Sequence, residues 1–184
     1  MTPAREICMR LTICLVLWSA ASLRAHDFKS EDGFTLLLGG KELAGWKTEK
    51  GESLDGKSEA YNGRFRAADG LLTLDPKVKG DVKIFTAGEF GKDVHIKFDF
   101  KPGPGCNNDL FLRGLKFDLK TPDVKNLKEG EWNAFEIVIA GDKAEYRNNG
   151  ETLKTVPVKG KASAFGIRAE FGPMQVRRLR VKEG

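Results

Sequence analysis

Residues 130–150 read GEWNAFEIVIAGDKAEYRNNG, and this stretch decides the fold of the chain. Within residues 133–140, large apolar side chains alternate with smaller or charged ones, and a period of two is typical of a β-strand. Gly141-Asp142 then precedes a second extended segment, 143–147, which runs into Asn149-Gly150. Gly, Asn and Asp accept the positive φ of tight hairpin turns at low cost. The stretch therefore predicts strands joined by hairpins, which is an antiparallel unit.

The same pattern recurs through the chain after residue 30, and no stretch there shows a sustained helical period. Short period-two segments are separated by Gly, Asn, Asp and Pro every 8 to 15 residues. The predicted strands are 34–38, 63–67, 71–75, 82–87, 94–101, 109–113, 115–120, 133–140, 143–147, 151–156, 164–171 and 174–182. So many short strands predict an all-β fold, a two-sheet antiparallel β-sandwich or jelly roll.

Two of these segments make detailed predictions. In residues 94–101, reading VHIKFDFK, we expect the four apolar side chains to face the core and the polar ones to face outward. In the last segment, Val176 and Leu179 are three residues apart, so they cannot share one face of a regular strand. One extra residue near Arg177-Arg178 would restore the pattern, which predicts a β-bulge there.

The first 25 residues have the order of a secretory signal peptide. Basic Arg5 and Arg10 precede an apolar run at 11–18, and small residues follow at 19–22. The run is much shorter than the ~20 apolar residues that a membrane-spanning helix needs. We therefore expect cleavage after Ala21 or Ala25, a domain over residues 26–184 and a periplasmic or secreted protein. Lipidation is not expected, because Cys14 lies inside the apolar run.

Charge and cysteine content argue against two classes of protein, nucleic-acid-binding proteins and disulfide-stabilised domains. Removing residues 1–25 takes away three arginines and one glutamate, so the net charge falls from +5 to +3. Basic and acidic residues are interleaved, which argues against a nucleic-acid partner. Cys106 is then the single cysteine, so stability must come from a packed core and not from an intramolecular disulfide.

Recognisable cofactor motifs are missing, and the functional residues must be sought in loops and strand faces. The sequence has no Ser-His-Asp order, no phosphate-binding glycine motif and no CxxC pair, so we expect neither a cofactor nor a resident metal. The most irregular segment is 101–109, reading KPGPGCNND. Asn107, Asn108 and Asp109 in this loop could bind sugar hydroxyls, offer oxygen ligands to a cation such as calcium, or simply form a turn.

A series of short motifs runs in order along the predicted domain. These are Gly33-Phe34-Thr35 with Leu36, Gly40-Lys41-Glu42-Leu43, Gly45-Trp46, Ala68-Asp69-Gly70-Leu71-Leu72, Phe90-Gly91-Lys92-Asp93-Val94, Phe98-Asp99-Phe100, Asn107, Leu112-Arg113, Gly130-Glu131-Trp132-Asn133, Asn149-Gly150 and Phe165-Gly166-Ile167. The ordered set, over residues 32–183, resembles the 3-keto-disaccharide (3-keto-glycoside) hydrolase domain family, a concanavalin-like sandwich of exported bacterial proteins. The resemblance implies a small carbohydrate or glycan as partner.

The resemblance also implies a reaction. A ketone at C3 of the sugar acidifies the neighbouring C2–H, so a base can drive elimination of the C1 aglycone, and water then adds. Arg113 matches the family's arginine and would stabilise the enolate. Glu170 stands where the family has a histidine, and either Glu170 or Asp118 would be the base. The family's loop after the arginine is shortened here, and its glutamate is missing or replaced by Lys116 or Asp118.

Each of these residues also has a structural interpretation. Arg113 can be a strand-end arginine paired with a carboxylate, and Asp118 can be an ordinary charge on a strand face. Strand alternation places Arg168, a predicted substrate contact, on the same face as Glu170, so the two can form an ion pair.

Functional and structural interpretations are also open for two tryptophans and for the domain as a whole. Trp46 can stack on a sugar ring or belong to the core, and we expect Trp132 in the core. Because the changed positions include Lys116, Ala169 and Glu170, a non-catalytic carbohydrate-binding sandwich is the alternative to the enzyme.

Overall fold

The computed structural model describes residues 28–184, and within this range the chain forms fourteen β-strands and no helix. No helix in the described part has the length and hydropathy of a membrane span. The predicted signal peptide lies outside the described residues. The prediction of an all-β sandwich is confirmed.

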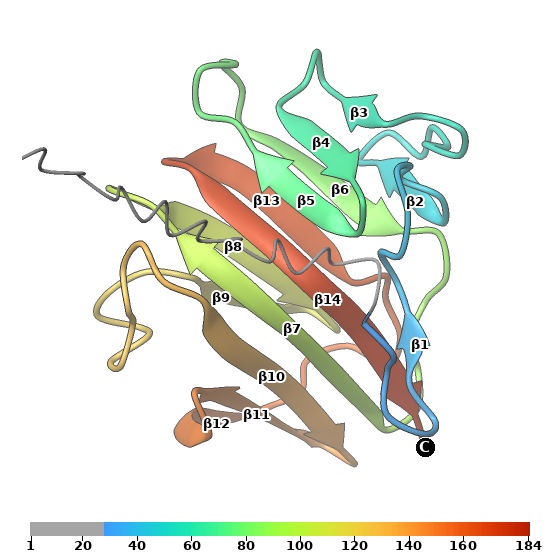
Figure 1. Ribbon diagram of the computed structural model, residues 1–184. Helices are drawn as coiled ribbons and strands as arrows, with labels where there is room; N and C mark the ends of the chain where they lie inside the picture. The colour runs from blue at the N-terminus through green and yellow to red at the C-terminus, as the bar shows by residue number, and fades with distance from the viewer. Residues whose placement is uncertain (1–27) are drawn as a thin grey trace, which may run out of the picture.

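The strands form two antiparallel sheets, one behind the other in Figure 1. The larger is nine-stranded, in the order β12 (Glu151–Pro157), β11 (Lys143–Asn148), β10 (Asn133–Ala140), β7 (Val94–Pro102), β14 (Met174–Glu183), β5 (Leu71–Leu74), β4 (Phe65–Ala68) and β3 (Glu59–Ala60), with β1 (Thr35–Leu36) also paired to β14. The smaller is five-stranded, in the order β2 (Trp46–Thr48), β6 (Val82–Thr86), β13 (Gly166–Phe171), β8 (Asn107–Leu112) and β9 (Leu115–Asp118).

The core lies between the sheets and is rich in aromatic rings. Phe117 on β9 meets Phe135 on β10 with ring centroids 5.2 Å apart, and it stacks on Tyr146 of β11 at 4.4 Å. All three side chains are at most 2% exposed. Burying one such ring contributes about 1.5–3 kcal/mol, so these contacts between the two sheets hold the layers together.

The hairpins predicted from residues 130–150 are confirmed. Strands β10 and β11 pair up to Ala140↔Lys143, which leaves Gly141-Asp142 as a two-residue turn. Strands β11 and β12 are joined by Asn149-Gly150, with φ of 51° and 82° at the two residues. Positive φ at both central residues defines the tight hairpin turn that Asn-Gly favours.

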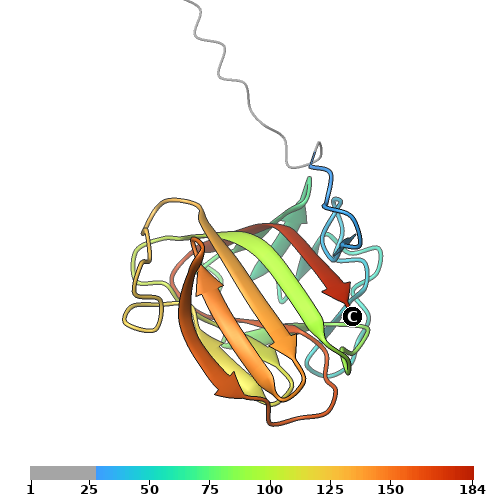
Figure 2. The ribbon, with the colours of Figure 1, turned by 90° about the horizontal axis from the view of Figure 1, so that it is seen from below.

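The predictions for the last strand and for residues 94–101 are also confirmed. Burial alternates strictly along β7, with the apolar residues inside. In Figure 2, β14 (red) runs beside β7 (green), and their register shifts between Arg177 and Arg180. Arg178 lies at this shift and has φ of 55°. It is the extra residue of the β-bulge.

Two short strands and one tryptophan differ from expectation. Strands β2 and β3 were not predicted, because two or three residues are too few to show a period. Trp132 is half-buried on the outer face of the nine-stranded sheet and not in the core. The Arg177 guanidinium lies 3.9 Å from the centre of its ring. This cation–π contact shields one face of the indole from solvent, and the sequence pattern does not reveal it.

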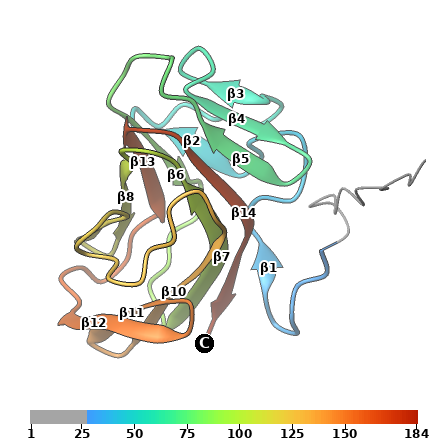
Figure 3. The same cartoon turned by 60° about the vertical axis from the view of Figure 1, so that its left-hand side comes forward.

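Two segments outside the sandwich strands are fixed by polar side chains. Asn133 is fully buried; its Oδ1 accepts from the Lys128 amide at 2.9 Å, and its Nδ2 donates to the carbonyls of Lys128 and Glu131 at 2.9 and 3.0 Å. This ties down the connection between β9 and β10. At the other end of the molecule, where β1 lies beside β14 (Figure 3), Arg180 makes a two-bond contact with Glu31 at 2.5 and 2.7 Å.

Candidate functional site

Six charged side chains gather on the outer side of the five-stranded sheet. We call them the charged cluster: Asp81, Asp109, Lys116, Asp118, Arg168 and Glu170. Alternation along the strands explains the grouping, because the intervening residues of β8, β9 and β13 point into the core. The register also places Arg168 opposite Asp109, and Asp109 opposite Asp118. Directly opposed side chains on neighbouring strands are in contact range.

Arg168 is the centre of the cluster. Its Nη1 lies 2.8 Å from Oδ2 of Asp109 and 3.1 Å from Oε2 of Glu170. Its Nε and Nη2 donate to the two carboxylate oxygens of Asp81 at 2.6 and 2.5 Å. The bond to Asp81, and then the bond to Asp109, raise the pKa of Arg168 above its ordinary value. The guanidinium is thus a permanent cation that holds three carboxylates in place. The ion pair with Glu170 confirms the same-face prediction.

Lys116 joins the other two carboxylates. Its Nζ lies 2.9 Å from Asp118 and 3.3 Å from Asp109. The two carboxyls differ in exposure: the Asp109 side chain is 0% exposed and that of Asp118 is 25% exposed. The Lys116 side chain is 45% exposed, so a ligand can approach it from solvent.

Asp109 and Asp118 titrate as a pair whose members are driven apart. Burial raises the pKa of Asp109, the Arg168 bond opposes that rise, and the nearby Asp118 carboxyl adds to it. At Asp118, burial acts in the same raising direction, but hydrogen bonds from Lys116 and Asp109 outweigh it and hold the pKa below its ordinary value. The buried carboxyl therefore holds its proton more tightly than the exposed one does. Two carboxyls divided in this way are a typical acid–base arrangement.

A hollow lies on either side of the charged cluster. The first, of about 310 Å³, is lined by Arg64, Lys79 and Phe171, together with Asp81 and Glu170 of the cluster. We call it the polar hollow. The second, of about 370 Å³, is lined by Phe85, Phe111 and other apolar residues, together with Lys116 of the cluster. We call it the phenylalanine hollow. Because each hollow shares a wall with the cluster, a ligand in either one would reach the charged groups.

Two asparagines next to the cluster have different surroundings. Asn107 donates to Oε2 of Glu170 at 3.5 Å, and its own Oδ1 is buried without a partner among the described residues. Asn108 is fully buried; its Oδ1 accepts from the Glu170 amide at 2.8 Å and its Nδ2 points to the Cys106 sulfur at 3.3 Å. Asn108 therefore braces the backbone under Glu170 and has no group free for a sugar.

Arg113 and Trp46 are not in the cluster. Arg113 occupies the turn between β8 and β9, with φ of 49°, and its Nε and Nη1 donate to the carbonyls of Gly160 and Lys92 at 3.0 and 3.3 Å. The cations of the cluster are Arg168 and Lys116 instead. Trp46 is 1% exposed and donates from Nε1 to the Leu37 carbonyl at 2.8 Å, so it presents no ring face for stacking.

Sequence reasoning brought Asp109, Asp118, Arg168 and Glu170 to the site but missed two members. Lys116 was noted only as a departure from the family pattern, although its position two residues before Asp118 would have placed both on one face. Asp81 comes from the loop before β6, 87 residues away from Arg168 in sequence, and no motif marks it.

A metal site is not formed by the carboxylates. Among residues 28–184, no three His, Cys, Asp or Glu side chains are placed to hold one ion. The calcium alternative for residues 107–109 also lacks converging ligands, since Asn108 turns inward.

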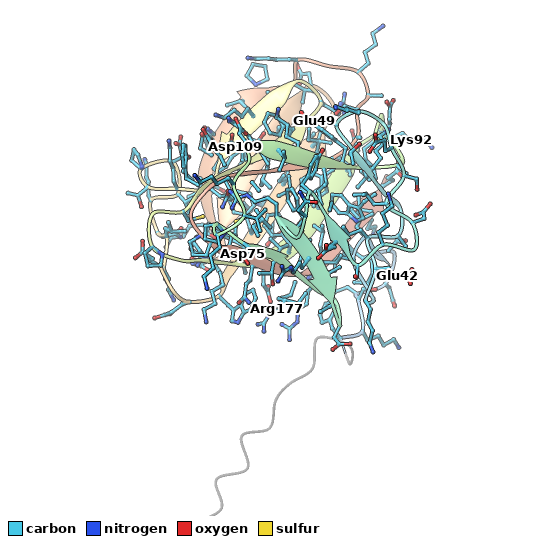
Figure 4. The ribbon with its side chains drawn as sticks, turned by 90° about the horizontal axis from the view of Figure 1, so that it is seen from above. Glu42, Glu49, Asp75, Lys92, Asp109 and Arg177 are labelled. Carbon is cyan, nitrogen blue, oxygen red and sulfur yellow. The ribbon has the colours of Figure 1, made fainter. Side chains whose placement is uncertain are left out.

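The site lies on one sheet of the molecule. Figure 4 shows Asp109 and Arg177 on opposite sides, Asp109 on the five-stranded sheet and Arg177 on the nine-stranded one. The arginines of β14 are therefore separate from the charged cluster.

Two-sheet sandwiches host many unrelated functions, so the class of this domain has to come from its relatives and its site. A family model described as the 3-keto-alpha-glucoside-1,2-lyase-like domain matches residues 33–126, just over half of the 184 residues. The chain belongs to this family, which confirms the resemblance. The match includes Asp81, Asp109, Lys116 and Asp118 but stops before β13.

Solved structures of the same fold share little sequence with the chain. A candidate glycosyl hydrolase from Parabacteroides distasonis ATCC 8503 has a TM-score of 0.67 at 16% identity, covering 83% of this chain and 94% of that one. Carbohydrate-binding module CBM66 from Bacillus subtilis has a TM-score of 0.55 at 13% identity, covering 76% and 96%. The exoplasmic/lumenal domain of VIP36, solved with Ca²⁺ and Man3GlcNAc, has a TM-score of 0.55 at 11% identity, covering 84% and 90%. No curated protein matches the sequence significantly.

Proposed function

We propose that this domain cleaves 3-keto-glycosides by elimination, and that the charged cluster carries the chemistry. The observation on which the proposal rests is the Asp109–Asp118 pair: one carboxyl is fully buried with a raised pKa, the other is partly exposed with a lowered pKa, and the Lys116 ammonium contacts both. Membership of the family supplies the substrate class, a glycoside oxidised at C3.

The residues of the cluster divide the reaction among them. The Asp118 carboxylate takes the proton from C2, and the electrons of that C–H bond form the C1=C2 double bond as the C1–O bond breaks. Negative charge that develops on the ketone oxygen during proton removal is stabilised by the exposed Lys116 ammonium. The departing oxygen takes up the proton that Asp118 removed, which restores the Asp118 carboxylate, and water then adds across C1=C2. Asp109 and Arg168 act as positioning residues, since they hold Lys116 and Glu170 in place.

Glu170 is the second possible base. Its side chain is 18% exposed and faces the polar hollow, so a sugar placed there would bring C2 to Glu170 and not to Asp118. The two assignments give different results on mutation. Asp118→Asn and Glu170→Gln each remove one carboxylate without changing side-chain size.

A binding function without chemistry is the competing proposal. It is favoured by the saturation of Arg168, whose three donor nitrogens are all occupied by carboxylates, as in a rigid recognition surface. The fold is also that of a protein named a carbohydrate-binding module.

Turnover of 3-keto-glucosides by the purified domain separates these proposals. We expect release of the aglycone by the wild type, and exchange of the C2 hydrogen with solvent deuterium. Asp118→Asn should lower kcat by roughly 100- to 10,000-fold with little change in KM, because a general base contributes that much. Arg66→Gln is the control, since Arg66 is a half-exposed residue outside the cluster that pairs with Glu59 at 3.6 Å. Binding without release or exchange would establish the non-catalytic function. A greater loss in Glu170→Gln than in Asp118→Asn would move the base to Glu170.

We also propose that the protein is exported to the periplasm or beyond the cell. The support is the basic, apolar and small-residue order of residues 1–25. Mass measurement of the protein recovered from the native host should give an N-terminus at residue 22 or 26. A full-length chain in the cytoplasmic fraction would overturn this proposal.

A further inference from the structure

The phenylalanine hollow is an apolar feature on a sheet face that is otherwise charged. Phe85 of β6 and Phe111 of β8 are both half-buried, with ring centroids 6.5 Å apart at 51°. Leu112 and Leu115, at 2% and 7% exposure, line the hollow below them. Half-buried aromatic rings beside polar catalytic groups are a common element of small-molecule sites.

Gly166 on β13 allows the two rings to approach each other. It is paired with Phe85 on one side and Phe111 on the other. A Cβ atom at Gly166 would lie 2.4 Å from Cε1 of Phe85 and 3.3 Å from Cβ of Phe111. The ring of Phe85 therefore leans over a position where only glycine fits, and any side chain there would displace it.

The polar groups in the walls of the hollow already have partners. The Ser163 hydroxyl accepts from the Arg113 amide at 2.6 Å and donates to the Ala164 carbonyl at 3.1 Å. The Lys116 ammonium contacts Asp118 and Asp109, and the reaction proposed above uses its remaining donor for the ketone oxygen. A second sugar in this hollow would have several hydroxyls without partners, which is unfavourable. A hydrocarbon ring needs none.

The hollow is close enough to the charged cluster to receive the group attached at C1. Gly166 and Arg168 are two positions apart on one face of β13, which is roughly 7 Å. Phe111 and Asp109 have the same spacing on β8, and Lys116 belongs to both the cluster and the hollow. A sugar ring bound at the cluster therefore has its aglycone within reach of the phenylalanines.

We propose that the substrates are 3-keto-glycosides with an aromatic aglycone, whose ring occupies the phenylalanine hollow. The proposal rests on the elimination reaction assigned above to the charged cluster. It adds a specificity that the family does not imply, a preference for a flat apolar leaving group over a second sugar.

A pair of substrates with leaving alcohols of similar acidity tests the preference. The benzyl and 2-hydroxyethyl glycosides of 3-ketoglucose differ in the apolar ring but little in intrinsic reactivity. We expect kcat/KM to be at least tenfold higher for the benzyl compound, since burial of a phenyl ring favours binding. In Phe111→Ala and Gly166→Ala, the ratio should fall below about threefold, through a loss of kcat/KM for the benzyl compound. Leu36→Ala, a 38% exposed residue on β1, is the matched control and should keep the wild-type ratio.

The outcomes distinguish this proposal from the one on which it rests. Turnover of both compounds without a benzyl preference, or a preference that survives both variants, would overturn the aromatic assignment and leave the elimination reaction standing. If neither compound reacts, the reaction proposal fails. Titration with unoxidised benzyl glucoside then tests whether the phenylalanine hollow binds an aromatic ring. The aromatic assignment is supported if the wild type binds benzyl glucoside and Phe111→Ala binds it at least fivefold more weakly. It is overturned if the two proteins bind equally well or if the wild type does not bind. Phe111→Leu replaces Phe111→Ala if the latter does not fold.

Discussion

Replacement of Arg168 by methionine would isolate the electrostatic balance of the charged cluster. Methionine keeps much of the side-chain bulk but removes the guanidinium that contacts Asp81, Asp109 and Glu170. Asp81 is 55% exposed and can be solvated after the change, whereas Asp109 is 0% exposed and cannot. The effect on stability should therefore come mainly from Asp109, with only Lys116 left at 3.3 Å.

The expected loss of stability depends on pH. Removing one partner of a buried ion pair costs about 3–5 kcal/mol. Asp109 can limit this cost by taking up a proton, which requires about 1.4 kcal/mol for each pH unit above its ordinary pKa. With an ordinary pKa of 3.8, protonating Asp109 costs about 1.6 kcal/mol at pH 5 and about 6 kcal/mol at pH 8, and the loss of stability cannot exceed this cost. We therefore expect a loss of about 3–5 kcal/mol at pH 8 and at most about 1.6 kcal/mol at pH 5.

The direction of this pH dependence of stability follows from the raised pKa of Asp109. A carboxyl that holds its proton more tightly in the folded state stabilises the fold at low pH, and this contribution is lost as pH rises from 3.8 through the folded pKa. Without Arg168, the bond that opposes the rise is gone, so the pH window widens.

Urea unfolding at pH 5 and pH 8, followed by the fluorescence of buried Trp46, measures both values. Arg168→Met with Asp109→Asn should recover about 2 kcal/mol at pH 8, because the unpaired charge is removed. Arg66→Met is the control, because its pair with Glu59 is exposed and should be worth at most about 0.5 kcal/mol at either pH. An equal loss at both pH values, or a double variant no more stable than the single one, would refute the reasoning.

Three further predictions concern the rest of the molecule. The Arg180 hydrogen bond lowers the pKa of Glu31 from 4.5 to about 2, so its stabilisation is present above 4.5 and is lost as pH falls to about 2. Because Glu31 is 46% exposed, Glu31→Gln should abolish only about 1 kcal/mol of that acid dependence, measured by urea unfolding between pH 5 and 2. Asn133→Asp removes two donated bonds in a buried site and should cost about 3 kcal/mol in chemical denaturation, and a cost below about 1 kcal/mol would contradict it. Burial raises the pKa of Cys106 to about 11, so a thiol reagent at pH 8 should label it only after unfolding, and rapid labelling of the folded protein would argue otherwise.

Local chemistry made the strands and turns of this fold predictable. The period of two in residues 94–101 and 133–140, the Asn149-Gly150 turn and the change of phase near Arg178 all appear in the structure as expected. Strands β2 and β3 escaped prediction because their residues become strands only by pairing with β6 and β4. The order of strands within each sheet is likewise set by contacts between distant segments, which no single window of sequence contains.

The site was predictable only as far as strand faces could be inferred. Alternation correctly grouped Arg168 with Glu170, whereas the inward turn of Asn108 could not be foreseen from a loop rich in Gly and Pro. Arg113 shows the limit of a resemblance. The family pattern identifies the residue, but Arg113 lies in a turn with positive φ and its guanidinium donates to the carbonyls of Gly160 and Lys92.

The position of β14 bears on how a nascent chain acquires this structure. This strand pairs with β7 along its length, with β5 near its start and with β1 near its end, yet it follows all three in the sequence. A ribosome must therefore synthesise everything up to residue 174 before the segment that unites these partners becomes available. Truncated translation products ending earlier would expose unpaired edges of β5 and β7, and proteases should clear them rather than allow a partial sandwich to accumulate.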